Sequence, residues 1–511
     1  MGLDVLVNAV VAIATSGSAI YVLLGVGLGL CFGVIPGLGG TTALALLIPI
    51  TFAMEPLDAM YLAGGVMGAT SFGGSITAIL INTPGTAPNA ATVFDGYPLA
   101  RQGKAGLAIG ASATASALGG VIGVLTLLVF IPIAKQMVLL FGPAEFFLLT
   151  LLGLTAIAVS AQGKLLRGLI AAAVGLLLSF VGVEAITGQL RYTGGSDYLW
   201  DGVGLVPTLT GMFAISQMIE LALKGGSVAV PKEETRQLTG VWEGVLSVFR
   251  HWTVLFRGSL IGTIIGAIPG LGGTVASFLA YTSTVQASRN PDSFGHGNIV
   301  GVIAPESANN AKDGGALIPT VAFGIPGSAE TAIFLGILVL HGIDPGPATL
   351  LNNEREIYGL IVALTLAAVG ASAIGLLTAR WLVLITFVNV NILVPVVIAV
   401  SLTGIYVLEG QPADVILCVV MGLLGYLMIR FDYPRLTLVI ALVLGETAER
   451  SYHQTLMISD YQMWSFIMGR PIAVVLVAGI VLTLLLPILR KRAFGRTRRE
   501  AASVPAKEPR P

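Results

Sequence analysis

Charged residues are scarce in this sequence of 511 residues. Only 11% of the residues are Asp, Glu, Lys or Arg, whereas 55% are hydrophobic. A water-soluble chain of this length needs much more polar surface and would usually divide into several domains. We therefore expect an integral membrane protein, in which the lipid bilayer takes the place of water around the apolar residues.

Cysteine and the usual signatures of metal or nucleotide sites are also lacking. The two cysteines, Cys31 and Cys418, lie within apolar runs, which excludes a disulfide framework. The four histidines are far apart in the sequence, and none has metal-ligand spacing. No phosphate-binding loop of the form G-x-x-x-x-G-K-[ST] occurs, so that route to ATP hydrolysis is excluded. We predict no metal site and no organic cofactor, and an ion gradient or a partner would drive any transport.

Long apolar stretches fill most of the chain between residues 19 and 489, and the candidate spans include 314–340, 357–379, 381–408 and 434–447. A complete span needs about 20 apolar residues, and several of the stretches are too short or too interrupted to cross alone. The 65 glycines favour close packing of membrane helices, because small residues let two backbones approach. We predict an all-α polytopic membrane protein with about 10–13 transmembrane helices and additional broken or re-entrant helical hairpins.

The chain contains an internal repeat. Residues 25–41 (GVGLGLCFGVIPGLGGT) and 258–274 (GSLIGTIIGAIPGLGGT) are identical at ten of 17 positions, at a fixed offset of 233. Glycine at every fourth position puts four glycines on one helical face, and the Pro-Gly that follows must end the helix. A second Pro-Gly pair follows each block, at Pro84 and at Pro326. We predict two pseudo-symmetric, inverted halves, residues 1–240 and 241–489, and then a tail, residues 490–511.

The tail is strongly basic. It holds eight of the 27 Lys and Arg residues in 22 positions. The positive-inside rule places such a segment in the cytoplasm, and its composition is typical of disorder. At the other end, Asp4 precedes the first apolar stretch and no basic residue does, which is unlike a cleaved signal peptide.

The two Pro-Gly-Leu-Gly-Gly breaks form the candidate substrate site. Their apolar arms are too short for full spans, so we expect the breaks to lie inside the protein, facing a cavity. A helix that begins there presents free N–H groups and a partial positive charge, which suit a carboxylate. Thr41 is the predicted N-cap after the first break. One copy alone would favour a surface turn, whereas two in-register copies favour a site. The candidate substrate-binding residues are Pro36, Gly37, Gly39, Gly40, Thr41, Ser75, Asn82, Thr83, Pro84, Gly85, Pro269, Gly270, Gly272, Gly273, Thr274, Asn309, Asn310, Lys312, Pro326, Gly327 and Ser328.

Residues 304–315 (APESANNAKDGG) are the most polar segment bounded by apolar stretches. Charges inside a membrane are costly and commonly functional. Glu306 could titrate or bind a cation, and Lys312 could pair with Asp313 or contact an anionic substrate. A solvated loop at the membrane interface explains the same residues equally well. The candidate cation-coupling residues are Glu306, Ser307 and Asp313.

Two other classes of function remain open at this level. An intramembrane hydrolase would use Ser75 or Ser328 with His341. Thirteen residues of one helix between Ser328 and His341 correspond to about 20 Å, which is too far for a hydrogen bond. A channel could also use broken helices, although channels usually have rotational symmetry around a pore.

Several motifs resemble one known family. They are GVIPGLGGT (33–41), GGSITAILINTPG (73–85), FDGYPLARQGKAGLAIG (94–110), APESANNAKDGGALIPTVAFGIPGSAETAIFLG (304–336) and GIDPGP (342–347). In these motifs the chain resembles the large membrane subunit of the tripartite tricarboxylate transporter family, and the resemblance extends from about residue 18 to 489.

The resemblance implies a system of three proteins in the bacterial inner membrane. Its other members would be a small four-helix membrane subunit and a periplasmic solute-binding protein. It also implies uptake of citrate or another organic carboxylate, coupled to Na⁺ or H⁺. No enzymatic activity and no nucleic-acid partner are expected.

Overall fold

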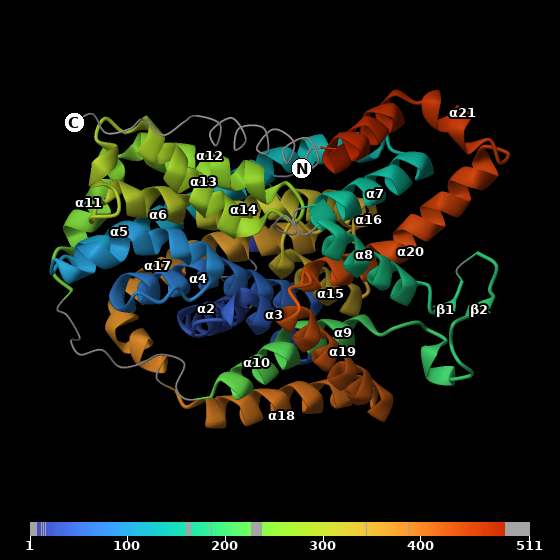
Figure 1. Ribbon diagram of the computed structural model, residues 1–511, viewed down its shortest axis with the longest axis horizontal. Helices are drawn as coiled ribbons and strands as arrows, with labels where there is room; N and C mark the ends of the chain where they lie inside the picture. The colour runs from blue at the N-terminus through green and yellow to red at the C-terminus, as the bar shows by residue number, and fades with distance from the viewer. Residues whose placement is uncertain are drawn as a thin grey trace, which may run out of the picture.

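The computed structural model describes residues 8–485, except residues 12, 14, 16, 160–164, 185, 226–237, 344 and 387. Asp4 and the basic tail 490–511, on which the predictions about the two chain ends rest, lie outside this range. The described residues are almost entirely helical and include one two-stranded sheet (Figure 1). The predicted all-α class is therefore confirmed for the part of the chain that the structure covers.

The first part of the chain forms, in order, α2 (Ala19–Val34), α3 (Gly39–Thr51), α4 (Pro56–Ile81), η1 (Ala87–Asn89), α5 (Ala90–Arg101), α6 (Ala105–Val138), α7 (Pro143–Val159) and α8 (Leu165–Ser179). The antiparallel strands β1 (Gly182–Val183) and β2 (Leu190–Arg191) follow and project at one end of the molecule (Figure 1). The next elements are η2 (Asp197–Leu199), α9 (Leu205–Leu209), the π-helical turn η3 (Thr210–Ile215) and α10 (Ser216–Lys224).

The second part of the chain forms α11 (Val241–Arg250), α12 (Trp252–Gly266), α13 (Gly272–Ala287), η4 (Pro291–Ser293), α14 (Val300–Phe323), α15 (Ala329–Leu340), α16 (Pro347–Asn352) and α17 (Glu354–Ile385). The remaining helices are α18 (Val390–Glu409), α19 (Pro412–Arg430), α20 (Arg435–Ile458) and α21 (Met463–Met468), with a further apolar helix at Pro471–Leu485.

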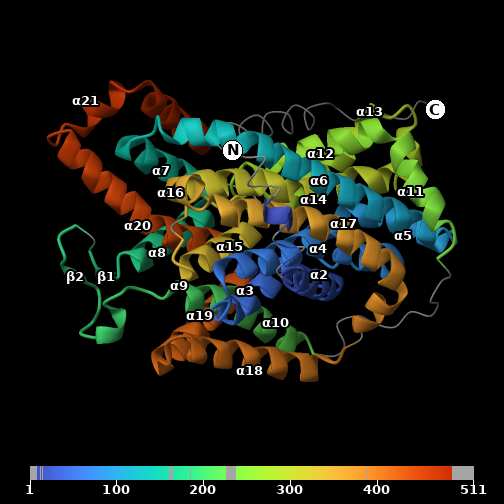
Figure 2. The ribbon, with the colours of Figure 1, turned by 180° about the vertical axis from the view of Figure 1, so that it is seen from behind.

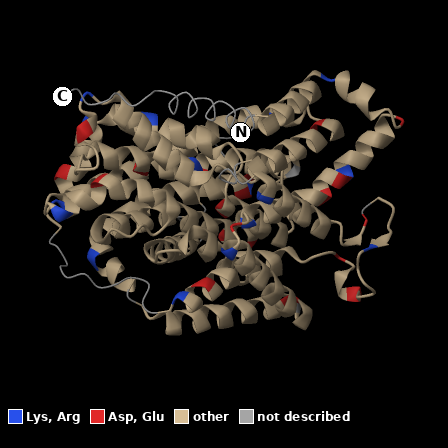
Figure 3. Ribbon diagram, in the orientation of Figure 1, with Lys and Arg blue, Asp and Glu red and all other residues tan. Residues whose placement is uncertain are grey.

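Six of the described helices are long and apolar enough to cross a membrane. They are α4, α6, the run α9–α10, α17, α18 and α19, and seven shorter apolar helices accompany them. Large apolar side chains such as Leu377 and Val407 are exposed on helix surfaces, as expected where lipid is the solvent. Figure 3 shows how sparse Lys, Arg, Asp and Glu are along the ribbon. A multi-pass membrane protein is thus supported.

The glycine face of α2 packs directly on α4. A Cβ at Gly25 would stand 2.4 Å from the carbonyl oxygen of Leu62, and one at Gly33 would stand 2.3 Å from that of Thr70. Because such distances leave no room for a side chain, only glycine permits this approach of two backbones. The predicted role of the glycine series is confirmed, and it fixes the helix that leads into the first break.

The second half repeats this packing between α12 and α14. A Cβ at Gly258 would stand 2.7 Å from the carbonyl oxygen of Ala304, and one at Gly266 would stand 2.3 Å from that of Lys312. The contacting glycines keep the offset of 233 found in the sequence, and their partners on α4 and α14 are offset by 242. The sequence repeat is therefore matched by a repeat of the helix–helix contacts.

The two halves are packed together through their long helices. α4 of the first half lies against α17, while α14 of the second half lies against α6. The arrangement is visible from both sides of the molecule, in Figure 1 and Figure 2. Each helix that receives a glycine face is thus buried between its own half and the other half, and 21 of the 26 residues of α4 are buried.

Some predicted boundaries are wrong. The apolar stretch 314–340 is divided, because α14 ends at Phe323 and α15 begins at Ala329. Residues 381–385 continue α17 rather than opening the next helix. Apolar composition does not reveal such turns, since the residues on both sides are equally hydrophobic.

Candidate functional site

The first predicted helix break is present. α2 ends at Val34, and Gly37 and Gly39 have φ of +86° and +61°, values that side chains with a Cβ rarely adopt. α3 begins at Gly39 with Leu38 in the N-cap position, so Thr41 lies inside the first turn. The prediction of Thr41 as the N-cap is wrong, because the left-handed glycine lets the helix start two residues earlier.

The second break has the same backbone. α12 ends at Gly266, Gly270 and Gly272 have φ of +83° and +65°, and α13 begins at Gly272. In each half the break is held by the later Pro-Gly tip. The N–H of Gly37 donates to the carbonyl of Gly85 at 3.2 Å, and that of Gly270 donates to the carbonyl of Gly327 at 3.3 Å.

The Pro-Gly tips are seated where glycine alone fits. A Cβ at Gly85 would stand 1.9 Å from the carbonyl oxygen of Gly33, and one at Gly327 would stand 2.7 Å from that of Gly266. Before each tip the helix ends in the left-handed region, at Asn82 (φ 60°). The corresponding position in the second half is Gly324 (φ 71°). Both tips therefore close on the breaks of their own half.

One cavity of about 790 Å³ lies where the two breaks meet. Its volume is within the range of about 300–1,000 Å³ that is typical of small-molecule sites. Thirteen of the predicted substrate-binding residues line it, from both halves of the chain: Gly37, Gly39, Gly40, Thr41, Pro84, Gly85, Gly270, Gly272, Gly273, Thr274, Asn309, Lys312 and Ser328.

The other predicted substrate-binding residues do not line the cavity. Asn82 is exposed at the end of α4, and Ser75 is fully buried behind the wall. The remaining six are Pro36, Thr83, Pro269, Asn310, Pro326 and Gly327. Gly327 holds the second break through its backbone, so it shapes the cavity without lining it.

The polar stretch 304–315 is buried helix. All twelve residues belong to α14 and are buried, so the interpretation as a solvated interfacial loop is wrong. α14 is enclosed by α6, α12 and α13, and the small residues of the stretch allow that packing. The charges of α14 consequently lie inside the protein.

Lys312 reaches the cavity wall as the centre of an ion cluster. Its Nζ is 2.8 Å from Oε2 of Glu330, and it also contacts the carboxylate of Asp313. The Lys312 and Asp313 side chains are each 5% exposed. Pairing with Asp313 is therefore confirmed, and Glu330, in the first turn of α15, is the additional partner.

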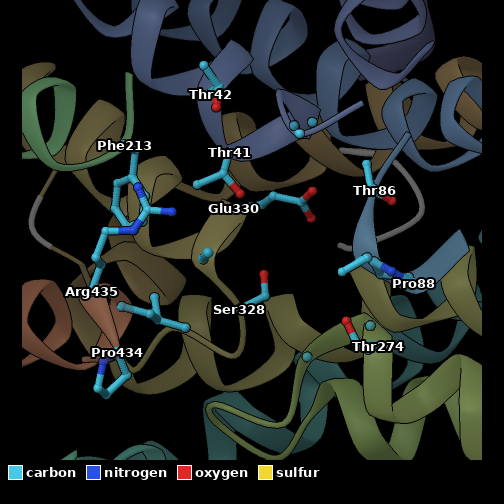
Figure 4. A pocket seen from close by; sticks show the side chains of 18 of the residues that line it. Thr41, Thr42, Thr86, Pro88, Phe213, Thr274, Ser328, Glu330, Pro434 and Arg435 are labelled. Atoms are coloured by element: carbon cyan, nitrogen blue, oxygen red, sulfur yellow. The ribbon is translucent and has the colours of Figure 1, made fainter. Parts of the chain in front are cut away.

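Arg435, at the start of α20, supplies a second positive charge. Its Nη1 donates to the carbonyl of Met212 at 3.0 Å and to Oγ of Ser216 at 2.7 Å, and the guanidinium lies 5.6 Å from the ring centroid of Phe213. No carboxylate pairs with it among the described residues. Figure 4 shows Arg435 and Phe213 side by side at one side of the cavity, with Thr86 at the other.

Arg435 and Glu330 were not among the residues predicted from the sequence. Both lie in stretches expected to be spans, 434–447 and 314–340. An ionisable residue within a predicted span is itself a signal of function, and this signal could have found them.

Asn309, in the cavity wall, has polar side-chain atoms without hydrogen-bond partners among the described residues. Its side chain is fully buried, and neither Oδ1 nor Nδ2 has a hydrogen-bond partner among the described residues. Unpaired buried amides are uncommon because they lose hydrogen bonds to water without replacement. Asn309 can therefore offer both a donor and an acceptor to a molecule in the cavity once the wall shifts to expose its amide.

The three predicted cation-coupling residues are not brought together. Glu306 accepts hydrogen bonds from three hydroxyl groups behind the cavity wall. The hydroxyl of Ser307 donates to the carbonyl of Ala304 within the same helix, at 3.0 Å. Asp313 belongs to the Lys312 cluster.

The geometry gives no support to the hydrolase alternative. Ser328 is the N-cap of α15, where its Oγ accepts from the N–H of Thr331 at 3.2 Å, whereas His341 is the C-cap at the far end of the same helix. Ser75 contacts Glu306 instead of a histidine. Neither serine therefore has a histidine within reach among the described residues, as the alternative with His341 requires.

A separate group of polar side chains lies near the β1–β2 strands. Ligand atoms of Glu184, Glu449 and His453 lie within 4.8 Å of one another. Arg191 already neutralises Glu449 through two bonds of 2.6 and 2.8 Å, and this hydrogen bonding raises the pKa of the guanidinium. An arginine within such a group competes with a metal ion, so the group is explained by ion pairing.

Comparison with known proteins agrees with the geometry. Residues 19–440 match the model of the Tripartite tricarboxylate transporter TctA family. An uncharacterized 52.8 kDa protein from the TAR-I ttuC' 3' region of Agrobacterium vitis is 33% identical over 495 residues, covering 94% of this chain and 95% of that protein. An uncharacterized protein from the TAR-II ttuC' 3' region of the same organism is 33% identical over 238 residues, or 45% of this chain and 96% of that protein. No solved structure matches. The chain belongs to the tripartite tricarboxylate transporter TctA family.

Proposed function

We propose that this protein is the large permease subunit of a binding-protein-dependent uptake system for an organic di- or tricarboxylate such as citrate. Membership of the TctA family supports transport as the activity, and no residue arrangement found in the described structure favours an enzyme. The cavity between the two breaks is the proposed carboxylate site.

The observation that carries this proposal is the meeting of three helix N-termini at one cavity. The first residues of α3 (Gly39, Gly40), α13 (Gly272, Gly273) and α15 (Ala329) all line it. The first turn of a helix has free N–H groups and a partial positive charge, which together favour bound anions. Helix ends from both halves thus offer a carboxylate several donors without requiring a matching number of basic side chains.

The two basic side chains of the cavity lining fit the same ligand, while the acids of the lining, Glu330 and Asp432, pair with Lys312 and Arg167. Among the described residues, the hydrogen bonds of the Arg435 guanidinium use Nη1 alone, and Lys312 is shared between two carboxylates. Guanidinium groups bind carboxylates in a planar, two-bond geometry. We assign Arg435 as the principal carboxylate ligand, with Lys312 and Asn309 of α14 as further ligands.

Uptake is proposed to be coupled to Na⁺ or H⁺. Glu306, Ser307 and Asp313 remain the candidate coupling residues, and the burial of all three in α14 supports the choice of Glu306 and Asp313 as the titratable groups. The two halves are proposed to be inverted in the membrane, as in other transporters with interrupted helices.

Membership of the TctA family supports the proposed partners and location. We propose a small four-helix membrane subunit and a periplasmic solute-binding protein as partners, in the bacterial inner membrane. The basic tail 490–511 supports a cytoplasmic C-terminus, because positive segments are retained on that side.

The test is uptake into proteoliposomes that contain this chain and both partner proteins. Radiolabelled citrate, a dicarboxylate and an uncharged sugar are compared under an imposed Na⁺ gradient, an imposed pH gradient and no gradient. We expect saturable carboxylate uptake that depends on one gradient and on the binding protein. Equal uptake of the sugar, or uptake that does not saturate, would contradict the proposal and favour a channel.

A further inference from the structure

Glu306 is a buried carboxylate without a counter-charge. Its side chain is fully buried in α14, and no basic side chain pairs with it among the described residues. Lys312, on the same helix, is already held by Asp313 and Glu330. An ionised carboxylate that is fully buried without an opposite charge strongly raises the free energy of the folded protein. Glu306 must therefore bind a proton or another cation in this conformation.

Three helices surround Glu306 with hydroxyl groups. Ser75 of α4 lies 2.7 Å from both carboxylate oxygens, Ser116 of α6 lies 2.8 Å from Oε2, and Thr92 of α5 contacts Oε1. Even a small metal cation such as Mg²⁺, with oxygen ligands at about 2.0–2.1 Å, keeps those oxygens about 3 Å apart, and a larger cation spaces them further. Oxygens at 2.7–2.8 Å are spaced for shared hydrogen atoms, so a proton fits here better than a metal ion.

The hydroxyl set can accommodate the carboxyl group with or without a proton. Ser75 Oγ is also 3.1 Å from the carbonyl of Ser71, so Ser75 can donate either to Glu306 or to that carbonyl. When Glu306 carries a proton, it can donate to Ser75, which then donates to Ser71. Each hydroxyl both donates and accepts, and no buried polar atom of this set loses its partner in either state.

One more hydroxyl is available beside the carboxyl group. Ser112 lies one turn before Ser116 on α6 and next to Glu306, and its Oγ is buried. A small shift lets this hydroxyl donate to a carboxyl oxygen in either protonation state, so Ser112 can add to the set that holds the group.

The hydroxyl set is connected to the cavity. Asn89 donates to Ser75 Oγ at 2.7 Å and to the Ser71 carbonyl at 2.9 Å, while its Oδ1 accepts from the N–H of Thr86 at 3.3 Å. Ser71 and Thr86 both line the cavity. Asn89 therefore links the first hairpin tip to Ser75, which donates a hydrogen bond to Glu306.

The surrounding charged groups leave Glu306 isolated. Asp95 of α5 accepts from Tyr281 of α13 and from three backbone N–H groups, and Arg257 of α12 donates to Thr284. On α4 the acid is Asp58, in the first turn, and α6 carries no charged residue from 105 to 134. α15 contributes Glu330, which is bound to Lys312.

We propose that Glu306 is a proton-binding site, held by Ser75, Thr92 and Ser116, that exchanges its proton with the cavity on the Ser71 side. In loading, one O–H bond forms on the carboxylate as a hydronium ion in the cavity water gives up its proton and becomes water, and release reverses this step. The loaded site is neutral, so it can move with the substrate without carrying an unpaired charge through the membrane. This inference rests on the proposed function, which it deepens by naming the coupling ion.

The direct test is infrared difference spectroscopy on the purified full-length chain in lipid, comparing acid with alkaline pH. We expect the carbonyl band of a protonated carboxyl group in the wild-type protein, its loss in Glu306→Gln and its retention in Glu145→Gln. Glu145 is a suitable control because it is equally buried but paired with Arg470 at 2.7 Å. In Ser75→Ala the band should move, because the hydrogen bond to the carboxyl group changes.

Two outcomes would overturn the assignment. The band could survive in Glu306→Gln, or Na⁺ added at constant pH could abolish it, which would make Na⁺ the ligand. If Glu306→Gln fails to fold, the band shift in Ser75→Ala and its reversal by Ser75→Thr still decide the question, since both keep the glutamate.

Transport assays distinguish a failure of this inference from a failure of the proposed function. With both partner proteins present, Glu306→Gln should retain carboxylate exchange across the membrane but lose its response to an imposed pH gradient. A full response in Glu306→Gln would contradict the proton site alone. Wild-type protein that moves no carboxylate, yet shows the titrating band, would contradict the proposed function and leave the proton site standing.

Discussion

Gly33 of α2 lies so close to Thr70 of α4 that a Cβ on the glycine would stand 2.3 Å from the threonine carbonyl oxygen. The same distance separates a Cβ on Gly266 from the carbonyl oxygen of Lys312 in the second half. In both halves the helix that precedes the break is positioned by backbone contact. The position of each break therefore depends on residues that carry no side chain.

This contact predicts different effects for two glycines of the same helix. Gly33→Ala should destabilise the protein by about 1–3 kcal/mol, because the added methyl group forces α2 away from α4. Gly27→Ala should have little effect or stabilise slightly, since its Cβ would meet nothing within 4 Å. Thermal unfolding of both variants in one detergent checks this, and equal midpoints would contradict the close packing.

Substitutions of Asn82 test whether this residue contributes through its backbone conformation or through contact with the ligand. It ends α4 at φ 60° and does not line the cavity, so its backbone should matter more than its amide. Asn82→Gly should retain uptake, whereas Asn82→Ala should reduce it, because alanine pays about 1 kcal/mol or more in the left-handed region. The measurement is uptake by both variants at equal amounts of protein in the membrane. Loss of uptake in both variants would indicate that Asn82 is a ligand after all.

Lys312 should contribute more to folding than either of its acidic partners. Lys312→Met would leave Asp313 and Glu330 buried together without a cation, which should cost about 3–5 kcal/mol. Adding Asp313→Asn and Glu330→Gln to that variant should recover much of the loss. The measurement is thermal stability of the single and triple variants, and an unstable triple variant would show that the ion cluster is not the cause.

Arg435 should determine carboxylate affinity. Arg435→Gln should raise KM for uptake roughly 30-fold or more, the equivalent of about 2 kcal/mol, because a charged hydrogen-bonding partner is removed. Arg435→Lys should recover little, since a lysine lacks the two-bond geometry. Arg450→Gln is the control, as Arg450 pairs with Glu446 away from the cavity. An unchanged KM in Arg435→Gln would exclude this residue as the ligand.

The helix breaks and their close packing could be predicted from the sequence because glycine and proline act locally. The glycines from Gly25 to Gly37 indicate both the helix face that makes the contact and the point where the helix ends. The repeat from Gly258 to Gly270 shows the same pattern. The start of α3 could not be predicted, because a threonine N-cap and a left-handed glycine are both reasonable there and only the backbone distinguishes them.

The polar interior was harder to predict because its partners are distant in the sequence. Ser75 contacts Glu306 across 231 positions, and Arg435 contacts Met212 across 223. A polar run such as 304–315 has the same composition whether it is a surface loop or a buried helix. Only the packing of α6, α12 and α13 around α14 distinguishes the two possibilities.

The backbone contacts of the glycine faces have a consequence for how this chain tolerates mutation. A scan of every position should show two matching tracks of intolerant sites, one through Gly25, Gly29 and Gly33 and the other displaced by 233 residues. Variants on the lipid-facing sides of the same helices should be neutral. Divergent family members could therefore change cavity side chains and substrates freely while keeping both tracks, and the tracks would serve to align sequences whose other residues have little in common.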